Sequence, residues 1–167
     1  KNLINNFLLL IKNINNNELK KLKFIIQCPK KLDFSIEKYL LDLKVDYQIE
    51  TFFYDIDNIL SKTHIAITRA GAGTINDLIR HKVPSIIFPL PNSIYDHQYY
   101  NAKFLLDKKA CIVLNEITFK LGDYSKDFNK LITNNKYFEN MKESISKIIL
   151  PDTNELILKT ILHKDNE

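Results

Sequence analysis

Short apolar runs alternate along the chain with longer segments whose apolar residues recur at helical spacing. The short runs predict strands at residues 23–28, 47–53, 64–68, 85–90 and 111–114. The longer segments predict helices at residues 2–16, 35–43, 56–61, 74–81 and 96–106, and two or three more within 121–163. Strands and helices therefore follow each other with short connections. This order is typical of a parallel sheet that helices cover on both faces.

The alternation predicts the α/β class with a doubly wound parallel sheet. No linker, repeat or low-complexity tract divides the sequence, so we expect one domain over residues 1–167, with a helical tail over about 121–167. In such sheets, ligands bind beyond the carboxyl ends of the strands. We therefore expect the site in the loops that follow Phe53, Thr68 and Leu90.

Length and composition narrow the class of protein. The 167 residues are 45% hydrophobic and 26% charged, which excludes a disordered chain, a collagen-like chain and a disulfide scaffold. The longest apolar run, residues 7–11, is far shorter than the roughly 20 residues of a membrane span. Cys28 and Cys111 have no metal-ligand or redox spacing, which favours a reducing compartment.

The net charge of +4 reflects a lysine-rich composition rather than a basic patch. Arginine occurs only as Arg69 and Arg80, and the lysines are scattered. Nucleic-acid binding needs clustered basic residues with aromatic residues between them. We therefore expect no nucleic-acid partner.

The most specific local motif joins a buried strand to a helix through a glycine loop, TRAGAGTIND at residues 68–77. Glycine permits a positive φ and a close approach of the backbone to a ligand. The N–H groups of the first helical turn favour phosphate. The dinucleotide-binding fingerprint is incomplete, because Asn76 stands in place of its third glycine. From the pattern alone, a phosphate-binding loop and a tight turn without a ligand both stay open.

Two charged residues accompany this loop. Asp77 lies in the first turns of the helix, where an acidic residue is favourable in any case, but its two oxygens also suit the two hydroxyls of a ribose. Arg69 is either half of a surface ion pair or a planar group of donors for a diphosphate.

A second polar cluster follows the next strand and opens a helix, PLPNSIYDHQYYNA at residues 89–102. His97 and Gln98 at the helix start are either surface residues or donors and acceptors for sugar hydroxyls. Asn101 is placed to fix the loop by bonding to backbone. We expect Phe52 and Phe53 in the core, and the sequence offers no metal-ligand set and no nucleophile–base pair.

Together these segments resemble the C-terminal, donor-binding half of the MurG family. Its members are the bacterial UDP-N-acetylglucosamine:N-acetylmuramyl-(pentapeptide) pyrophosphoryl-undecaprenol N-acetylglucosaminyltransferases. Three pieces carry the resemblance in matching order and spacing: FFYDI at 52–56, the glycine loop, and the segment 89–102, whose HQYYNA resembles the family's HQxxNA element. The resemblance covers about residues 1–116 and continues weakly through the tail. It implies the second Rossmann-like domain of a GT-B glycosyltransferase.

The resemblance also implies which residues bind the substrate, UDP-N-acetylglucosamine (UDP-GlcNAc). By this resemblance, Phe53 contacts the uracil through its backbone, Ile56 packs near the nucleoside, and Asp77 binds the ribose hydroxyls. The loop around the diphosphate and the sugar comprises Arg69, Ala72, Gly73 and Thr74. The GlcNAc hydroxyls are bound by His97 and Gln98. The family usually has glutamate at the position of Asp77. No metal and no cofactor besides this substrate is implied.

The implied reaction is inverting transfer of GlcNAc to lipid-linked N-acetylmuramyl-pentapeptide, which converts lipid I to lipid II in peptidoglycan synthesis. It would take place in the cytoplasm, on the inner face of the bacterial plasma membrane. Two parts of the family pattern are missing. One is a first strand with a GGSxGA loop, which would lie between the strands at 23–28 and 64–68. The other is the N-terminal acceptor domain, which meets the lipid-linked acceptor and holds the candidate general base.

We therefore expect no catalytic residue in this chain, which starts at Lys1 rather than Met, and no activity without the acceptor domain. Two alternatives stay open. One is the catalytic chain of a dolichol-type GlcNAc transferase. The other is a noncatalytic nucleotide-binding module, which would bind UDP and UDP-GlcNAc without discriminating the sugar.

Overall fold

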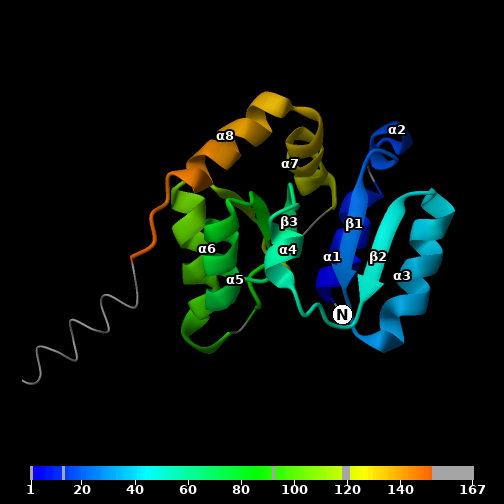
Figure 1. The fold of residues 1–167 in the computed structure, drawn as a ribbon, viewed down its shortest axis with the longest axis horizontal. Coiled ribbons are helices and arrows are strands. Elements are labelled where there is room, and N and C mark those ends of the chain that lie inside the picture. The colour runs from blue at the N-terminus through cyan, green and yellow to red at the C-terminus, as the bar shows by residue number, and fades with distance from the viewer. Residues whose placement is uncertain (1, 13, 92, 118–120, 152–167) are drawn as a thin grey trace, which may run out of the picture.

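Strands and helices alternate in the computed structural model, which describes residues 2–12, 14–91, 93–117 and 121–151 (Figure 1). In chain order the elements are α1 (Asn2–Ile11), α2 (Asn16–Leu19), β1 (Lys23–Gln27), α3 (Lys30–Leu43), β2 (Asp46–Glu50), α4 (Ile56–Leu60), β3 (Ala66–Thr68), α5 (Ala72–His81), β4 (Ser85–Ile87), the 3-10 turn η1 (Ile94–Asp96), α6 (His97–Asp107), β5 (Cys111–Val113), α7 (Leu121–Thr133) and α8 (Asn135–Ser146).

The strands of the described residues are all parallel, as expected, but they form two sheets rather than one. β1 pairs with β2 from Lys23↔Asp46 to Gln27↔Glu50. β4 lies between β3 and β5 in a second sheet. No strand pairing joins β1 to β3 within the described ranges, and Figure 1 shows the two sheets side by side. The break falls where the first strand of the family pattern would lie.

Helices cover both faces of the three-stranded sheet. Ile86 packs into a core cluster with residues of α1 and α7, and Ile87 packs into another with residues of α5 and α6. Neighbouring side chains of a strand point to opposite faces, so each isoleucine fills one side of β4. Both are at most 1% exposed. Burying one such side chain stabilises the fold by about 1.5–3 kcal/mol.

The predicted helical tail is confirmed for α7 and α8, where α7 packs against α1 and α8. Residues 152–163, the last part of the predicted helical tail, lie outside the described residues. No helix in the described part of the chain is long and apolar enough to cross a membrane.

Several expected boundaries are wrong. The first helix ends at Ile11 rather than at residue 16, and Asn15 instead caps α2 by accepting from the N–H of Asn17 at 2.9 Å. β2 ends at Glu50, because its neighbour β1 ends just before Pro29, and the last bond between them runs from Cys28 N to Glu50 O. Phe53 therefore lies in the connection to α4 and does not end a strand.

The expected burial of the Phe52–Phe53 pair is also wrong in part. The Phe52 side chain is 57% exposed, while Phe53 is half-buried. Phe52 contacts Tyr54 edge-on, with ring centroids 5.1 Å apart, and Tyr54 is 95% exposed. The segment after β2 thus presents aromatic surface to solvent rather than to the core.

Candidate functional site

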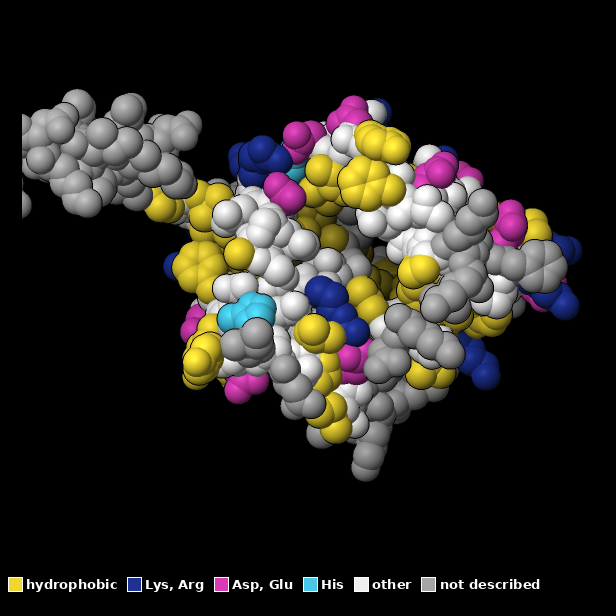
Figure 2. Space-filling view, turned by 90° about the horizontal axis from the view of Figure 1, so that it is seen from below, with side chains coloured by type: hydrophobic (Ala, Val, Ile, Leu, Met, Phe, Trp, Pro, Cys, Tyr) yellow, Lys and Arg dark blue, Asp and Glu magenta, His cyan; other side chains and the backbone are white. Residues whose placement is uncertain are grey.

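The loops after β3 and β4 reach the same edge of the sheet, because these strands are parallel neighbours. α5 begins after the first loop and α6 after the second. Figure 2 looks at the molecule from the end where β2 terminates in Figure 1. On this face, basic and acidic side chains meet near the centre, beside a hollow.

The glycine loop leaves the start of α5 open. The first backbone bond of this helix runs from Ile75 N to Gly71 O (2.9 Å), so the N–H groups of Ala72, Gly73 and Thr74 precede it. Such groups have no partner within the helix and attract anions. Ala72 and Gly73 are exposed, and Thr74 is half-buried. A Cβ built at Gly73 would meet no atom within 4 Å, so the space above this turn is open.

The glycines do not use the positive φ that this residue type permits. Gly71 has a φ of −64°, and no glycine among the described residues has a positive φ. The backbone of the loop therefore does not require glycine for its conformation. What remains for Gly73 is the other predicted property, close access of a ligand to the backbone.

Two amide side chains of α6 hold the glycine loop. Gln98 Oε1 accepts hydrogen bonds from the N–H of Ala70 (3.3 Å) and of Leu90 (3.0 Å). Asn101 Nδ2 donates to Ala70 O (3.0 Å), which confirms that Asn101 fixes the loop through its backbone. Both backbone polar groups of the fully buried Ala70 are thus satisfied by one face of α6. The Gln98 side chain thus bonds to both the loop after β3 and the loop after β4.

This arrangement fixes the orientation of the Gln98 amide. Two N–H donors face its oxygen, so Nε2 is the group that remains, and no described residue accepts from it. Gln98 is half-buried at the start of α6. It can therefore donate to a sugar hydroxyl, but its acceptor is already occupied.

His97 is the exposed first residue of α6 and follows two residues in the left-handed region. Tyr95 and Asp96 both have φ 52° and ψ 26°. Non-glycine residues adopt this conformation at a cost and mostly where the surroundings hold them there. The strained turn sets the direction in which α6 starts, and hence the position of His97 and Gln98.

Arg69 does not reach toward open space. Its Nη1 donates to the carbonyls of Phe88 (3.1 Å) and Pro89 (3.4 Å), and its Nη2 pairs with Glu116 Oε1 at 2.8 Å. The Arg69 side chain is 25% exposed and that of Glu116 only 7%. Arg69 thereby ties the end of β3 to the loops after β4 and β5. This geometry favours a role in positioning the loops over the expected direct contact with a diphosphate.

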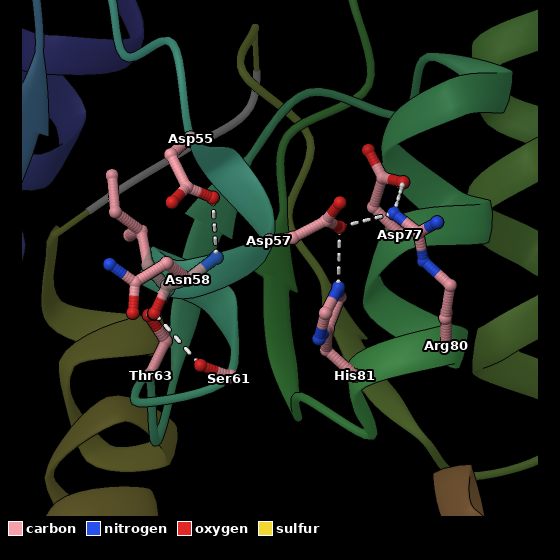
Figure 3. Close-up of polar contacts among 9 residues, drawn as sticks. Asp55, Asp57, Asn58, Ser61, Thr63, Asp77, Arg80 and His81 are labelled. Carbon is pink, nitrogen blue, oxygen red and sulfur yellow. Dashed lines mark hydrogen bonds and ion pairs between the residues drawn. The ribbon is translucent and has the colours of Figure 1, made fainter.

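Asp77 belongs to a surface network between α4 and α5, which Figure 3 shows. Asp77 Oδ1 accepts from Arg80 Nη2 at 3.1 Å. The same Nη2 donates to Asp57 on α4, and Asp57 also bonds His81 Nε2 at 2.8 Å. The hydrogen bond to His81, with the charge of Arg80, lowers the pKa of Asp57. Asp77 is half-buried, and no described residue is bonded to its second carboxylate oxygen.

The predicted nucleoside end of the site lies at the start of α4. Asp55 caps this helix by accepting from the N–H of Asn58 at 3.0 Å (Figure 3). Ile56, the first residue of α4, is 40% exposed, and Phe53 precedes it in the connection from β2. The Asp57–Arg80 ion pair joins α4 to α5. It therefore fixes the position of Ile56 relative to Asp77.

The described residues hold no group of three or more His, Cys, Asp or Glu side chains that could bind a metal ion. Cys111 is buried, and burial raises the pKa of its thiol to about 12. A protonated, buried thiol is a poor nucleophile. The described groups can bind and orient an anionic, hydroxyl-rich ligand, and they would do so mainly by donating hydrogen bonds.

Some residues of this site were missed by the sequence reasoning. Glu116 and Asp57 lie 47 and 23 residues from their arginine partners, and no local pattern connects them. Arg80 stands three residues after Asp77, a spacing that places both on one face of a helix. That spacing could have identified Arg80 from the sequence.

Comparison with known proteins places the chain in a family. The family described as "Glycosyltransferase family 28 C-terminal domain" matches residues 2–155. A UDP-N-acetylglucosamine--N-acetylmuramyl-(pentapeptide) pyrophosphoryl-undecaprenol N-acetylglucosamine transferase of Wolbachia pipientis wMel is 28% identical over 87% of this chain. The protein of the same name from Rickettsia canadensis (strain McKiel) is 34% identical over 76% of it. The chain spans 42% and 36% of the lengths of these two relatives.

Solved structures agree on the fold. The crystal structure of Acinetobacter baumannii MurG superimposes with a TM-score of 0.77 at 23% identity, over 92% of this chain and 48% of that one. The glycosyltransferase VinC, solved with dTDP, gives a TM-score of 0.65 at 16% identity, over 96% of this chain and 40% of that one. These likenesses confirm the predicted α/β architecture of a GT-B C-terminal domain. With the family match over residues 2–155, they establish that the chain belongs to the glycosyltransferase family 28 C-terminal domains.

Proposed function

We propose that this chain is the donor-binding part of an inverting glycosyltransferase that uses UDP-GlcNAc. The acceptor would be lipid-linked N-acetylmuramyl-pentapeptide, as in the names of the Wolbachia and Rickettsia relatives. A polyprenyl-linked acceptor stays in a membrane, so the enzyme would work on the cytoplasmic face of the bacterial plasma membrane. The acceptor would be held by a separate N-terminal domain, which accords with the share of each relative that this chain spans.

One observation carries the proposal. Gln98 accepts from the backbone of both the glycine loop and the loop after β4. The open start of α5 and the start of α6 therefore form one rigid unit. The first turn of α5 suits the diphosphate of the donor. Gln98 Nε2 and His97 then suit the hydroxyls of the sugar attached to that diphosphate.

The remaining residues are assigned from their contacts. Asp77 accepts from the ribose hydroxyls with the oxygen that Arg80 leaves available, and Ile56 packs near the nucleoside beside the backbone of Phe53. Arg69 holds the loops in place. Transfer to a hydroxyl requires a base that removes its proton, and no side chain described at this site is placed as one. The base would come from the acceptor domain, so the chain alone would be inactive.

Calorimetric titration of UDP-GlcNAc and of UDP into the protein tests this proposal. UDP-GlcNAc should bind more tightly than UDP, because Gln98 and His97 add bonds to the sugar. Asp77→Ala should weaken both ligands by about 10-fold or more, since hydrogen bonds to a charged group contribute about 1.5–3 kcal/mol. Gln98→Ala should weaken UDP-GlcNAc more than UDP.

Matched controls are Asp42→Ala and Gln48→Ala, which change exposed residues of α3 and β2. They should leave both affinities unchanged. Equal affinity for UDP and UDP-GlcNAc would instead favour the alternative, a nucleotide-binding module without sugar discrimination. A folded protein that binds no uridine nucleotide would refute both, while the fold would stand.

A further inference from the structure

A polar cavity lies at the edge of the β3–β5 sheet opposite the loops that follow β3 and β4. It is open to solvent, has a volume of about 240 Å³ and is lined by residues that precede β3 and β4 and by residues of α8. This volume is several times the roughly 30 Å³ that one water molecule occupies in liquid water. It has room for a phosphate group and accompanying water. None of the residues assigned above to donor binding lines it.

The charged groups that line this cavity are all basic. The cavity is lined by Lys62, Lys82 and Lys142, together with His64 and His81, and by no carboxylate of the described residues. None of the three lysines forms an ion pair with a described residue. Three like charges around one cavity repel each other, and a bound anion would relieve that repulsion.

Helix ends explain only part of this arrangement. Lys82 is the left-handed C-cap of α5, and Lys62 follows the last turn of α4, where cations are favourable. Lys142 lies inside α8 and has no such reason to be there. Its ammonium group is 5.8 Å from the centre of the Phe138 ring, which also lines the cavity.

We propose that this cavity is a binding site for a phosphate group, separate from the loops proposed to bind the donor. The three ammonium groups supply charge-assisted hydrogen bonds to phosphate oxygens. The phosphate comes either from a soluble ion or ester or from the headgroup of an anionic lipid.

Amide NMR of the protein titrated with inorganic phosphate at low ionic strength locates the site. Peaks of residues 61–64, 81–83 and 138–142 should shift together. The double variant Lys82→Gln/Lys142→Gln should weaken phosphate binding by roughly 10-fold or more, since charge-assisted bonds are lost. UDP-GlcNAc binding should not change in this variant.

The chain offers a closely matched control, Lys44→Gln/Lys136→Gln. Lys44 is a left-handed C-cap with φ 54°, like Lys82 with φ 56°, and Lys136 lies on α8 like Lys142. The control variant should bind phosphate as the unchanged protein does. If both variants lose stability equally and phosphate binding is unchanged or absent, the lysines only serve helix ends and the proposal is overturned. Shifts confined to residues 72–74 would overturn it too.

Sedimentation with vesicles distinguishes the source of the phosphate. Binding to phosphatidylcholine vesicles that contain phosphatidylglycerol, lost in the Lys82→Gln/Lys142→Gln variant and absent with phosphatidylcholine alone, would identify a lipid headgroup. Phosphate binding without vesicle binding would identify a soluble ion or ester. Vesicle binding that both double variants retain equally, without phosphate-induced shifts at the cavity, would contradict the site.

Discussion

The two sheets of this protein differ in how deeply their strands are buried and in how many side chains hold their loops. In β1 and β2 exposed and half-buried residues alternate, and side-chain contacts such as Lys23–Asp46 lie at the surface. In the other sheet β4 is buried at every position. Beyond its strands, side chains of Arg69, Gln98 and Asn101 bond to backbone 19 to 31 residues away.

This difference indicates that the β3–β5 sheet and its loops are the more rigid part of the molecule. The loops of the β3–β5 sheet are cross-linked, and every residue assigned to the diphosphate and the sugar lies on them or on the helices they start. The β1–β2 sheet contributes only the segment that leads to α4. A binding site needs side chains whose positions are already set. Six substitutions test this contrast between the two sheets.

The largest difference should come from the strand cores. Ile87→Ala removes a side chain that is 0% exposed and should lower the free energy of unfolding by about 2–5 kcal/mol. Ile25→Ala in β1 removes one that is 39% exposed and should cost about 1 kcal/mol or less. Urea unfolding followed by circular dichroism measures both. Similar costs would mean that the two sheets are equally well packed.

The next difference should come from ion pairs. Glu116→Gln leaves the partly buried Arg69 without its counter-charge and should destabilise the protein by about 2 kcal/mol. Asp46→Asn breaks the exposed pair with Lys23 and should cost less than about 0.5 kcal/mol. The midpoint of thermal unfolding reports both. Glu116→Gln should also weaken UDP-GlcNAc binding, and unchanged affinity would contradict a positioning role for Arg69.

A smaller, local effect should follow from the Gln98 bridge. In Gln98→Ala the N–H groups of Ala70 and Leu90 lose their acceptor, so their hydrogen exchange should accelerate by roughly 3- to 10-fold. Exchange at the β1–β2 pair should stay as it is. The Gln48→Ala variant serves as the control. If exchange at Ala70 is insensitive to Gln98, the two loops are not held as described.

The smallest effect should be the pH dependence of the α4–α5 network. Because the pKa of Asp57 is lowered in the folded state, its ionised form stabilises the fold above its unfolded pKa of about 3.9. That contribution is lost as the pH falls through the folded value. Asp57→Asn should therefore flatten the stability curve below about pH 4. Identical curves for the variant and the unchanged protein would show that the network contributes nothing.

The sequence predicted the order of strands and helices well, because hydrophobic periodicity reports directly on local structure. Boundaries were less accurate where a neighbouring element decides them. The strand expected to reach Phe53 ends at Glu50 because β1 offers no partner beyond that point. The burial expected for Phe52 failed for the same reason, since an apolar residue outside a strand has no sheet face to pack on.

The candidate site was predicted by motif, but its internal contacts were not. Asn101 was correctly expected to fix the loop, since its place next to Gln98 on one helix face is a local property. The partner of Arg69 was not predictable, because Glu116 comes close only once three parallel strands align. Likewise, the positive φ at Tyr95 and Asp96, just before α6, was not predicted from the sequence.

We expect the loops that follow β3 and β4 to bind the donor UDP-GlcNAc, which amide NMR of the protein titrated with this ligand can test. The peaks of residues 70–77, 90 and 97–98 should shift. With UDP instead, the peaks of residues 97 and 98 should not shift. Shifts that avoid these residues, or no shifts in a folded protein, would contradict it.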